Sequence, residues 1–178
     1  GNATLKMLFI CIDGVRSDSL AAMPHVTHLI THRSASYSMF NNVPVPISGP
    51  SWTTILTGLT EKIHGVHTNP DLADKEISHP TIFDEVSQQS AKYTQKHFIS
   101  SWNPFKNILA RSQETVRVIG SDTHDQDISK NDHKVFEHTR SLLDKEKTPD
   151  IITNYYMSVD DAGHHFGFGL HIPEYKES

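Results

Sequence analysis

Short apolar runs alternate along this chain with segments whose apolar residues recur at helical spacing. Runs bounded by turn-forming residues predict strands over residues 5–12, 37–43, 93–100, 115–119 and 150–159. Helical spacing and capping residues predict helices over residues 17–32, 48–56, 81–89 and 134–145. We expect loops over residues 61–75 and 121–131, and residues 102–112 are ambiguous. This alternation is typical of an α/β fold, in which helices flank a mostly parallel sheet.

Length and composition restrict the class of protein. A chain of 178 residues is a usual size for one domain, so we expect residues 1–178 to form a single α/β domain. The formal net charge of -5 argues against a nucleic-acid duplex as partner, because duplex-binding proteins usually present a basic face. No apolar run is long enough to span a membrane. Cys11 is the only cysteine, which excludes an internal disulfide and a cysteine-based zinc site.

The first candidate site residue is Asp13, which directly follows a strand that we expect to be buried. Ligands of open α/β sheets bind at the carboxyl ends of the strands. A carboxylate at such a place is able to hold a divalent cation. Asp13-Gly14 is also a common turn pair, so a purely structural role in a turn or a helix cap stays open.

The second candidate is Ser48, where Ser48-Gly49-Pro50 begins a predicted helix. A hydroxyl there lies among unpaired backbone N–H groups and at the positive end of the helix dipole. That environment suits an anionic phosphate and a serine nucleophile, although Ser48 also suits an ordinary N-cap. The nucleophile elbow of α/β-hydrolases is a poorer match, because Thr53 replaces its second glycine and Pro50 obstructs the turn.

The third candidate is the pair Asp160 and His164. Four residues separate them, and Gly163 frees the backbone beside the histidine, so both side chains are able to reach one cation. The alternative is a polar loop in which Asp161 and His165 are merely solvated. We favour the metal-binding interpretation.

Other polar residues are predicted to have no functional role. Seven of the 13 histidines lie in polar stretches without ligand spacing, namely His25, His28, His32, His79, His97, His133 and His138. The segment Ser121-Asp122-Thr123-His124-Asp125 contains metal-type residues, but their spacing is loose and we expect a plain loop.

The three motifs, in this order, resemble those of the type I phosphodiesterase/nucleotide pyrophosphatase branch of the alkaline phosphatase superfamily. Residues 9–18 resemble the first metal motif, an apolar strand followed by Asp-Gly-x-Arg-x-Asp. Residues 23–29 resemble the helix entry that follows, residues 48–66 resemble the nucleophile helix, and residues 160–167 resemble the second metal motif. The resemblance therefore extends over most of the chain.

The resemblance implies metal-dependent hydrolysis of phosphodiesters or pyrophosphates, with a small phosphate ester as substrate. It implies two divalent metal ions, usually zinc, one held by Asp13 and Ser48 and the other by Asp160 and His164. Ser48 would attack phosphorus and form a phospho-enzyme that water then hydrolyses. Ser51 stands where the family has a substrate-binding asparagine, so a shorter hydroxyl replaces an amide.

The family pattern continues with an Asp-His-Gly motif and a further histidine, and nothing after Gly167 supplies them. We therefore expect this chain to be the N-terminal part of a larger metal-dependent hydrolase domain, with weak metal binding or none and no activity by itself. An incomplete sheet exposes an edge, so association of copies through that edge is a hypothesis. The sequence does not predict a location: no signal-peptide pattern is present, and the resemblance allows a periplasmic or extracellular one.

Two alternatives stay open. Ser48-Gly49-Pro50-Ser51 also resembles the sulfatase nucleophile box, although Trp52 stands where that box has arginine, so a sulfatase-like hydrolase or a phosphotransferase is the first alternative. The second is a catalytically idle α/β module used for binding, since a fold does not determine a function. The presence of all the motif residues together argues against the idle module.

Overall fold

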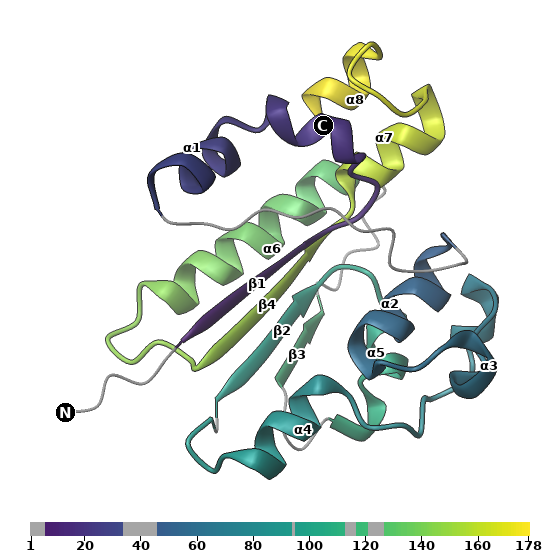
Figure 1. Ribbon diagram of the computed structural model, residues 1–178, viewed down its shortest axis with the longest axis vertical. Helices are drawn as coiled ribbons and strands as arrows, with labels where there is room; N and C mark the ends of the chain where they lie inside the picture. The colour runs from purple at the N-terminus through teal and green to yellow at the C-terminus, as the bar shows by residue number, and fades with distance from the viewer. Residues whose placement is uncertain (1–5, 34–45, 94, 113–116, 121–126) are drawn as a thin grey trace. The chain divides into compact units, whose positions relative to one another are not determined.

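The computed structural model describes residues 6–33, 46–93, 95–112, 117–120 and 127–178 (Figure 1). The chain divides into two compact units, which are described separately. The first comprises Gly1–Cys11 and Val43–Tyr156, and the second comprises Ile12–Asn42 and Met157–Ser178. The strand predicted over residues 37–43 and the segment 121–125 lie outside the described residues.

The first unit contains a parallel sheet. Its four strands are β1 (Met7–Ile12), β2 (Lys96–Ser100), β3 (Arg117–Gly120) and β4 (Ile151–Tyr156), in the order β1-β4-β2-β3. β2 runs parallel to both of its neighbours, with Phe98 paired to Val118 on one side and to Thr153 on the other. Parallel strands require crossover connections, which the intervening helices provide. The α/β fold class is confirmed.

β1 forms where the apolar run predicts a strand, but most of it is not buried. Met7, Leu8 and Ile10 are 44%, 42% and 51% exposed, whereas Cys11 is 3% exposed. Within the described residues β1 lies at one end of the sheet, with β4 as its neighbour. An edge position explains the exposure, because a strand with one partner has one side uncovered. Association of copies through this edge stays a prediction.

Helices of the first unit largely follow the predicted pattern. They are α2 (Ser48–Thr57), α3 (Glu61–His64), α4 (Ile82–Gln89), α5 (Phe105–Ile108) and α6 (Ile128–Leu143), with 3-10 helices at Asn69–Leu72 and Ala110–Ser112. α6 begins earlier than predicted, because the Asp127 carboxylate caps it by accepting from the Lys130 backbone N–H at 3.3 Å. The predicted loop over residues 61–75 and the ambiguous segment 102–112 both contain short helices.

An aromatic cluster fills the core around Phe105. The Phe105 ring centroid lies 4.7 Å from that of Phe98 and 4.8 Å from that of Tyr155, and all three residues are almost fully buried. A second cluster joins Ile99 and Ile152 of the sheet to Val135 and Leu142 of α6, which packs against β2 and β4 (Figure 1). Burial of these apolar side chains is the main stabilising contribution to this unit.

The second unit is helical. It contains a 3-10 helix (Ser17–Ala22), α1 (Pro24–His32), α7 (Ser158–Phe166) and α8 (Pro173–Glu177). The single helix predicted over residues 17–32 is interrupted, because Met23 takes the extended backbone (φ -99°, ψ 94°) that a residue before proline prefers. The strand predicted over residues 150–159 ends at Tyr156, and α7 follows it. None of the helices in the described ranges has the length and apolarity needed to cross a bilayer.

Candidate active site

In the first unit, Ser48 is the first residue of α2, as the sequence predicts. The preceding residue, Ile47, has extended backbone dihedrals, so the helix begins sharply at the serine. The backbone N–H groups of the first turn are already engaged: that of Gly49 donates to Asn69 Oδ1 at 2.6 Å, and that of Ser51 donates to the Ile47 carbonyl at 2.9 Å. Pro50 has no N–H group. These amides are therefore less open to an anion than a free helix N-terminus suggests.

Several close contacts hold α2 in place. A Cβ atom at Gly49 would lie 2.9 Å from Asn69 Oδ1 and 3.2 Å from Asn69 Cα, so this helix turn lies directly against the 3-10 helix Asn69–Leu72. The Trp52 ring packs edge-on against Tyr155 at 5.4 Å and against Phe105 at 6.0 Å. Because Trp52 lies one turn beyond Ser48, this packing fixes the start of the helix against the aromatic core.

His64 of α3 is a buried polar residue that sequence reasoning did not single out. Its Nδ1 accepts a hydrogen bond from the Val66 backbone N–H at 3.1 Å. The proton of the neutral ring therefore lies on Nε2, which is 2.9 Å from Thr54 Oγ1 and donates to it. Burial lowers the pKa of His64, although the charge of Glu61 partly opposes this shift. The neutral imidazole thus ties α3 to α2.

In the second unit, the Asp13-Gly14 turn packs directly against α7. Gly14 has φ +73°, and a Cβ atom there would lie 2.4 Å from Asp160 Cα. Only glycine allows this backbone approach. The Tyr175 hydroxyl of α8 secures the turn, since it donates to the Gly14 carbonyl at 2.8 Å and accepts from the Arg16 backbone N–H at 2.9 Å. The turn therefore places the Asp13 and Asp160 carboxyl groups near each other.

Asp160 lies in the first turn of α7 rather than at the end of a strand. Its Oδ2 is 3.4 Å from His164 Nε2, one turn later on the same face. Burial raises the pKa of Asp160, the negative charge of Asp13 raises it further, and His164 opposes these effects. The negative charge of Asp13 disfavours ionisation of Asp160, and an imidazole lies beside Asp160, so this is an environment that a cation would stabilise.

A second pair of side chains lies beside the first on α7. Asp161 Oδ1 is 3.5 Å from His165 Nδ1, which also lies 2.9 Å from the Asp161 carbonyl. These contacts are ordinary for residues four apart on a solvated helix face. Over the described ranges of the chain, no group of three or more histidine, cysteine, aspartate or glutamate side chains is arranged to hold a metal ion.

Comparison with known proteins identifies the family. The sequence profile of the family described as type I phosphodiesterase/nucleotide pyrophosphatase matches residues 7–178. The chain belongs to this family. The resemblance to this family noted from its motifs is thus confirmed. No curated protein matches the sequence.

Two solved structures show the fold of this phosphodiesterase-family chain. Both are of murine ectonucleotide pyrophosphatase/phosphodiesterase 5, and the second is an inactive variant in complex with AMP. The TM-scores are 0.63 and 0.66, each at 18% sequence identity. The matches cover 91% and 97% of this chain but 46% and 48% of the murine chains. This family member therefore spans about half the length of the structures that it resembles.

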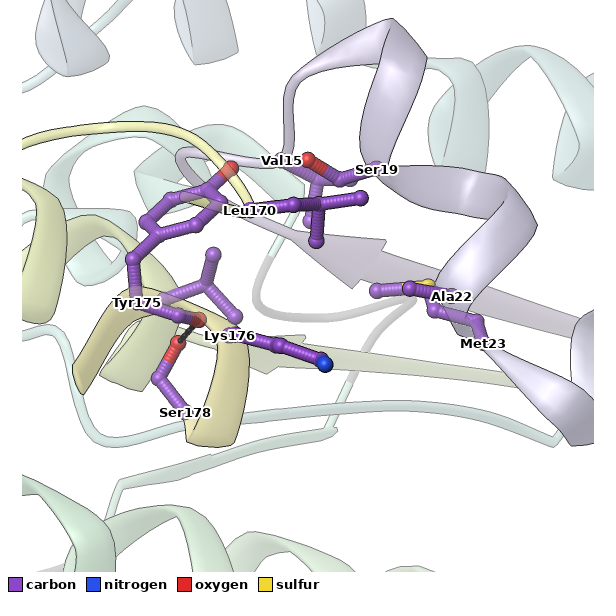
Figure 2. A pocket seen from close by; sticks show the side chains of 9 residues that line it. Val15, Ser19, Ala22, Met23, Leu170, Tyr175, Lys176 and Ser178 are labelled. Carbon is purple, nitrogen blue, oxygen red and sulfur yellow. Dashed lines mark hydrogen bonds between the residues drawn. The ribbon is translucent and has the colours of Figure 1, made fainter. Parts of the chain in front are cut away.

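Two features of this phosphodiesterase-family chain are found only in the structure. Gly163 is helical and does not form a tight turn; a Cβ atom there would lie 2.1 Å from the Phe168 ring, so glycine is needed for close packing. A pocket of about 60 Å³ lies beside the Asp13 turn and is lined in part by Val15, Ser19 and Tyr175 (Figure 2). The pocket has room for water. Among the described residues the buried Ser19 hydroxyl has no hydrogen-bond partner, and a water molecule in this pocket would provide one.

Proposed function

We propose that the complete protein hydrolyses small phosphodiesters or pyrophosphates with the help of two divalent metal ions, zinc being the expected metal. Family membership supports the class of reaction. The observation that carries the proposal is the backbone approach between Gly14 and Asp160, which brings two carboxyl groups of separate motifs together. A structural turn alone has no need of a second carboxyl group that raises the pKa of Asp160.

Three residues of the second unit fit the chemistry of cation binding. Asp160 and His164 provide an oxygen and a nitrogen ligand on one helix face, and Asp13 provides a further oxygen. In the proposal, Asp160 and His164 hold one ion, and Asp13 holds the other together with Ser48. The ions supply Lewis-acid stabilisation of the phosphoryl oxygens and activate the serine.

Ser48 is the proposed nucleophile. Its Oγ forms a bond to phosphorus while the bond from phosphorus to the leaving oxygen breaks, and the serine proton passes to that oxygen, which departs as an alcohol or a phosphate. The phosphoryl group on Ser48 keeps the other ester group of the substrate. Water then attacks this phosphorus, which releases a phosphomonoester and regenerates the Ser48 hydroxyl. The packing of Trp52 and the close contact at Gly49 support this role, because a nucleophile on a rigid element needs little reorganisation to react.

Ser51 is the proposed substrate-binding residue, one helical turn from Ser48. Its hydroxyl donates a single hydrogen bond, whereas the asparagine of the family pattern offers two donors. The backbone amides of Gly49 and Ser51 are engaged within the protein, so they do not supply the missing donors. We therefore propose that this family member steadies its phosphate chiefly through the metal ions and one hydroxyl.

The test is a set of esterase assays on the complete polypeptide that contains this chain, loaded with zinc. Chromogenic phosphodiester, phosphomonoester and sulfate ester substrates are compared, followed by nucleotide diesters. The diester is expected to be turned over best, a chelator to stop turnover, and Ser48→Ala to abolish it. Ser51→Ala is the matched control on the same helix, which is expected to raise KM and to keep measurable kcat.

Three results count against the proposal. Equal diester turnover by Ser48→Ala and wild type would refute the nucleophile. Preference for the sulfate ester would favour the sulfatase-like alternative, and no turnover of any ester by the zinc-loaded polypeptide would favour an idle binding module.

A further inference from the structure

Helix α1 of the second unit carries two exposed histidines, His28 and His32, that the proposed hydrolase site does not use. Among the 13 histidines of the chain, His28 and His32 are the only two that lie four residues apart. The regular helix Pro24–His32 puts such residues on the same face, one turn apart. Their imidazole rings are stacked, with centroids 4.5 Å apart and planes inclined by 21°. The helix thus provides the ligand spacing that the sequence pattern did not reveal.

The hydrogen bonds around His32 determine which of its ring nitrogens carries the proton. Nδ1 lies 2.7 Å from Thr31 Oγ1 and 3.2 Å from the His28 carbonyl oxygen. The Thr31 hydroxyl donates its proton to the Thr27 carbonyl at 2.9 Å, so its oxygen is left to accept. Both neighbours of Nδ1 are therefore acceptors, and Nδ1 carries the proton in the neutral ring.

The Nε2 atom of neutral His32 consequently has a free lone pair. A metal-binding histidine commonly donates its other ring N–H to a carbonyl or a similar acceptor, which fixes the tautomer and the orientation of the ring. His32 already has that arrangement through the His28 carbonyl and Thr31. The His28 ring is stacked on that of His32, and both residues are exposed to solvent.

We propose that His28 and His32 chelate one divalent transition-metal ion of the class of Zn²⁺, Ni²⁺ or Cu²⁺ on the surface of α1. Imidazole suits these borderline cations. Two nitrogens bound to one ion at about 2.0–2.1 Å lie roughly 3 Å apart, so rings whose centroids are 4.5 Å apart have to tilt toward each other to share an ion. Water fills the remaining coordination positions. This site is separate from Asp160 and His164 and does not depend on the proposed hydrolase activity.

The test is a calorimetric titration of this 178-residue chain with NiCl₂. It compares wild type with His28→Ala, His32→Ala, the double variant and His25→Ala. His25 is the matched control, because it is an exposed histidine on the same helix, while the ring stacked on His28 is that of His32. Circular dichroism checks that each variant keeps its helix content, which is expected since all three side chains are exposed.

Either single alanine variant is expected to lose one bound nickel ion relative to wild type, and the double variant to lose no more than either single. Such non-additivity is the signature of two ligands that act on one ion. His25→Ala is expected to bind as wild type does, and nickel is expected to raise the Tm of wild type and of His25→Ala more than that of the other variants. Additive losses, or an equal loss in His25→Ala, would show independent single-histidine binding and overturn the proposal.

Discussion

The contact between Gly14 and Asp160 predicts a large effect of adding a single methyl group. In Gly14→Ala the new Cβ atom would lie 2.4 Å from Asp160 Cα, whereas ordinary contacts begin at 3.4 Å, so the two segments must separate by about 1 Å. The positive φ of +73° adds a backbone cost of roughly 1–2 kcal/mol, and overpacking of this kind adds about 1–3 kcal/mol. We expect the free energy of unfolding to fall by roughly 2–5 kcal/mol. On the proposed function, a shift of about 1 Å is also enough to lower the activity of the complete protein about 100-fold.

Gly58→Ala is the matched control for this prediction. Gly58 has nearly the same dihedral angle, φ +71°, but a Cβ atom there would meet no heavy atom within 4 Å. This variant should lose only the backbone contribution of about 1–2 kcal/mol. Urea denaturation followed by circular dichroism measures both losses, provided that the denaturant dependence is the same in the two variants. Equal destabilisation of the two variants would refute the inference that the Gly14 turn is packed tightly against Asp160.

Three other predictions concern named side chains. Because the folded-state pKa of His64 lies below the usual value of about 6.5, folding favours the neutral ring. The free energy of unfolding should therefore be highest above that pH and fall as the pH drops below it. Urea titrations at several pH values should show that His64→Gln flattens this dependence. Phe105→Ala should cost about 3–5 kcal/mol by urea denaturation, because Phe105 is 1% exposed, whereas Phe136→Ala, at a residue that is 48% exposed, should cost far less. Asp160→Asn should raise the Tm of the metal-free protein, because it removes a charge that burial disfavours. The control Asp161→Asn should not raise the Tm. A lower Tm for Asp160→Asn would contradict the electrostatic argument.

Local signals in the sequence predicted much of the fold. The sequence predicts the start of α2 from Ser48 and the proline in its first turn; in the structure Ser48 is the first helical residue, and Ile47, which makes no side-chain cap, holds the N-cap position. The end of α2 follows from Gly58, which takes the left-handed conformation. Thr81 caps α4 through a reciprocal pair of hydrogen bonds with Asp84, as its position predicted. These features depend on neighbours within a few residues, so a single sequence reveals them.

Features that depend on distant residues were not predicted. An apolar run such as β1 indicates a strand, but its burial depends on which strands lie beside it in the sheet. Val159 continues the apolar pattern of the preceding residues, so the sequence predicts a strand that extends beyond Tyr156. Helix α7, which follows instead, is short and gives little helical periodicity to read. The hydrogen bonds of Tyr175 to the Asp13-Gly14 turn join residues about 160 positions apart in the sequence, and no local pattern indicates them.

The charges around Asp160 in α7 affect how strongly Asp160 and His164 would bind a cation. The first turn of a helix favours a negative charge, yet the pKa of Asp160 is raised, so burial and Asp13 outweigh the support of the helix. On the proposed function, a cation held by Asp160 and His164 would favour the ionised carboxylate of Asp160 and oppose the raised pKa. On the proposed function, the other cation, held by Asp13 and Ser48, would offset the charge of a phosphate at Ser48, because the backbone amides of Gly49 and Ser51 are engaged within the protein. Metal affinity and diester turnover should therefore fall together as the pH is lowered toward the raised pKa of Asp160. A loss of turnover at constant metal affinity would show that the serine, not the carboxyl pair, limits the reaction.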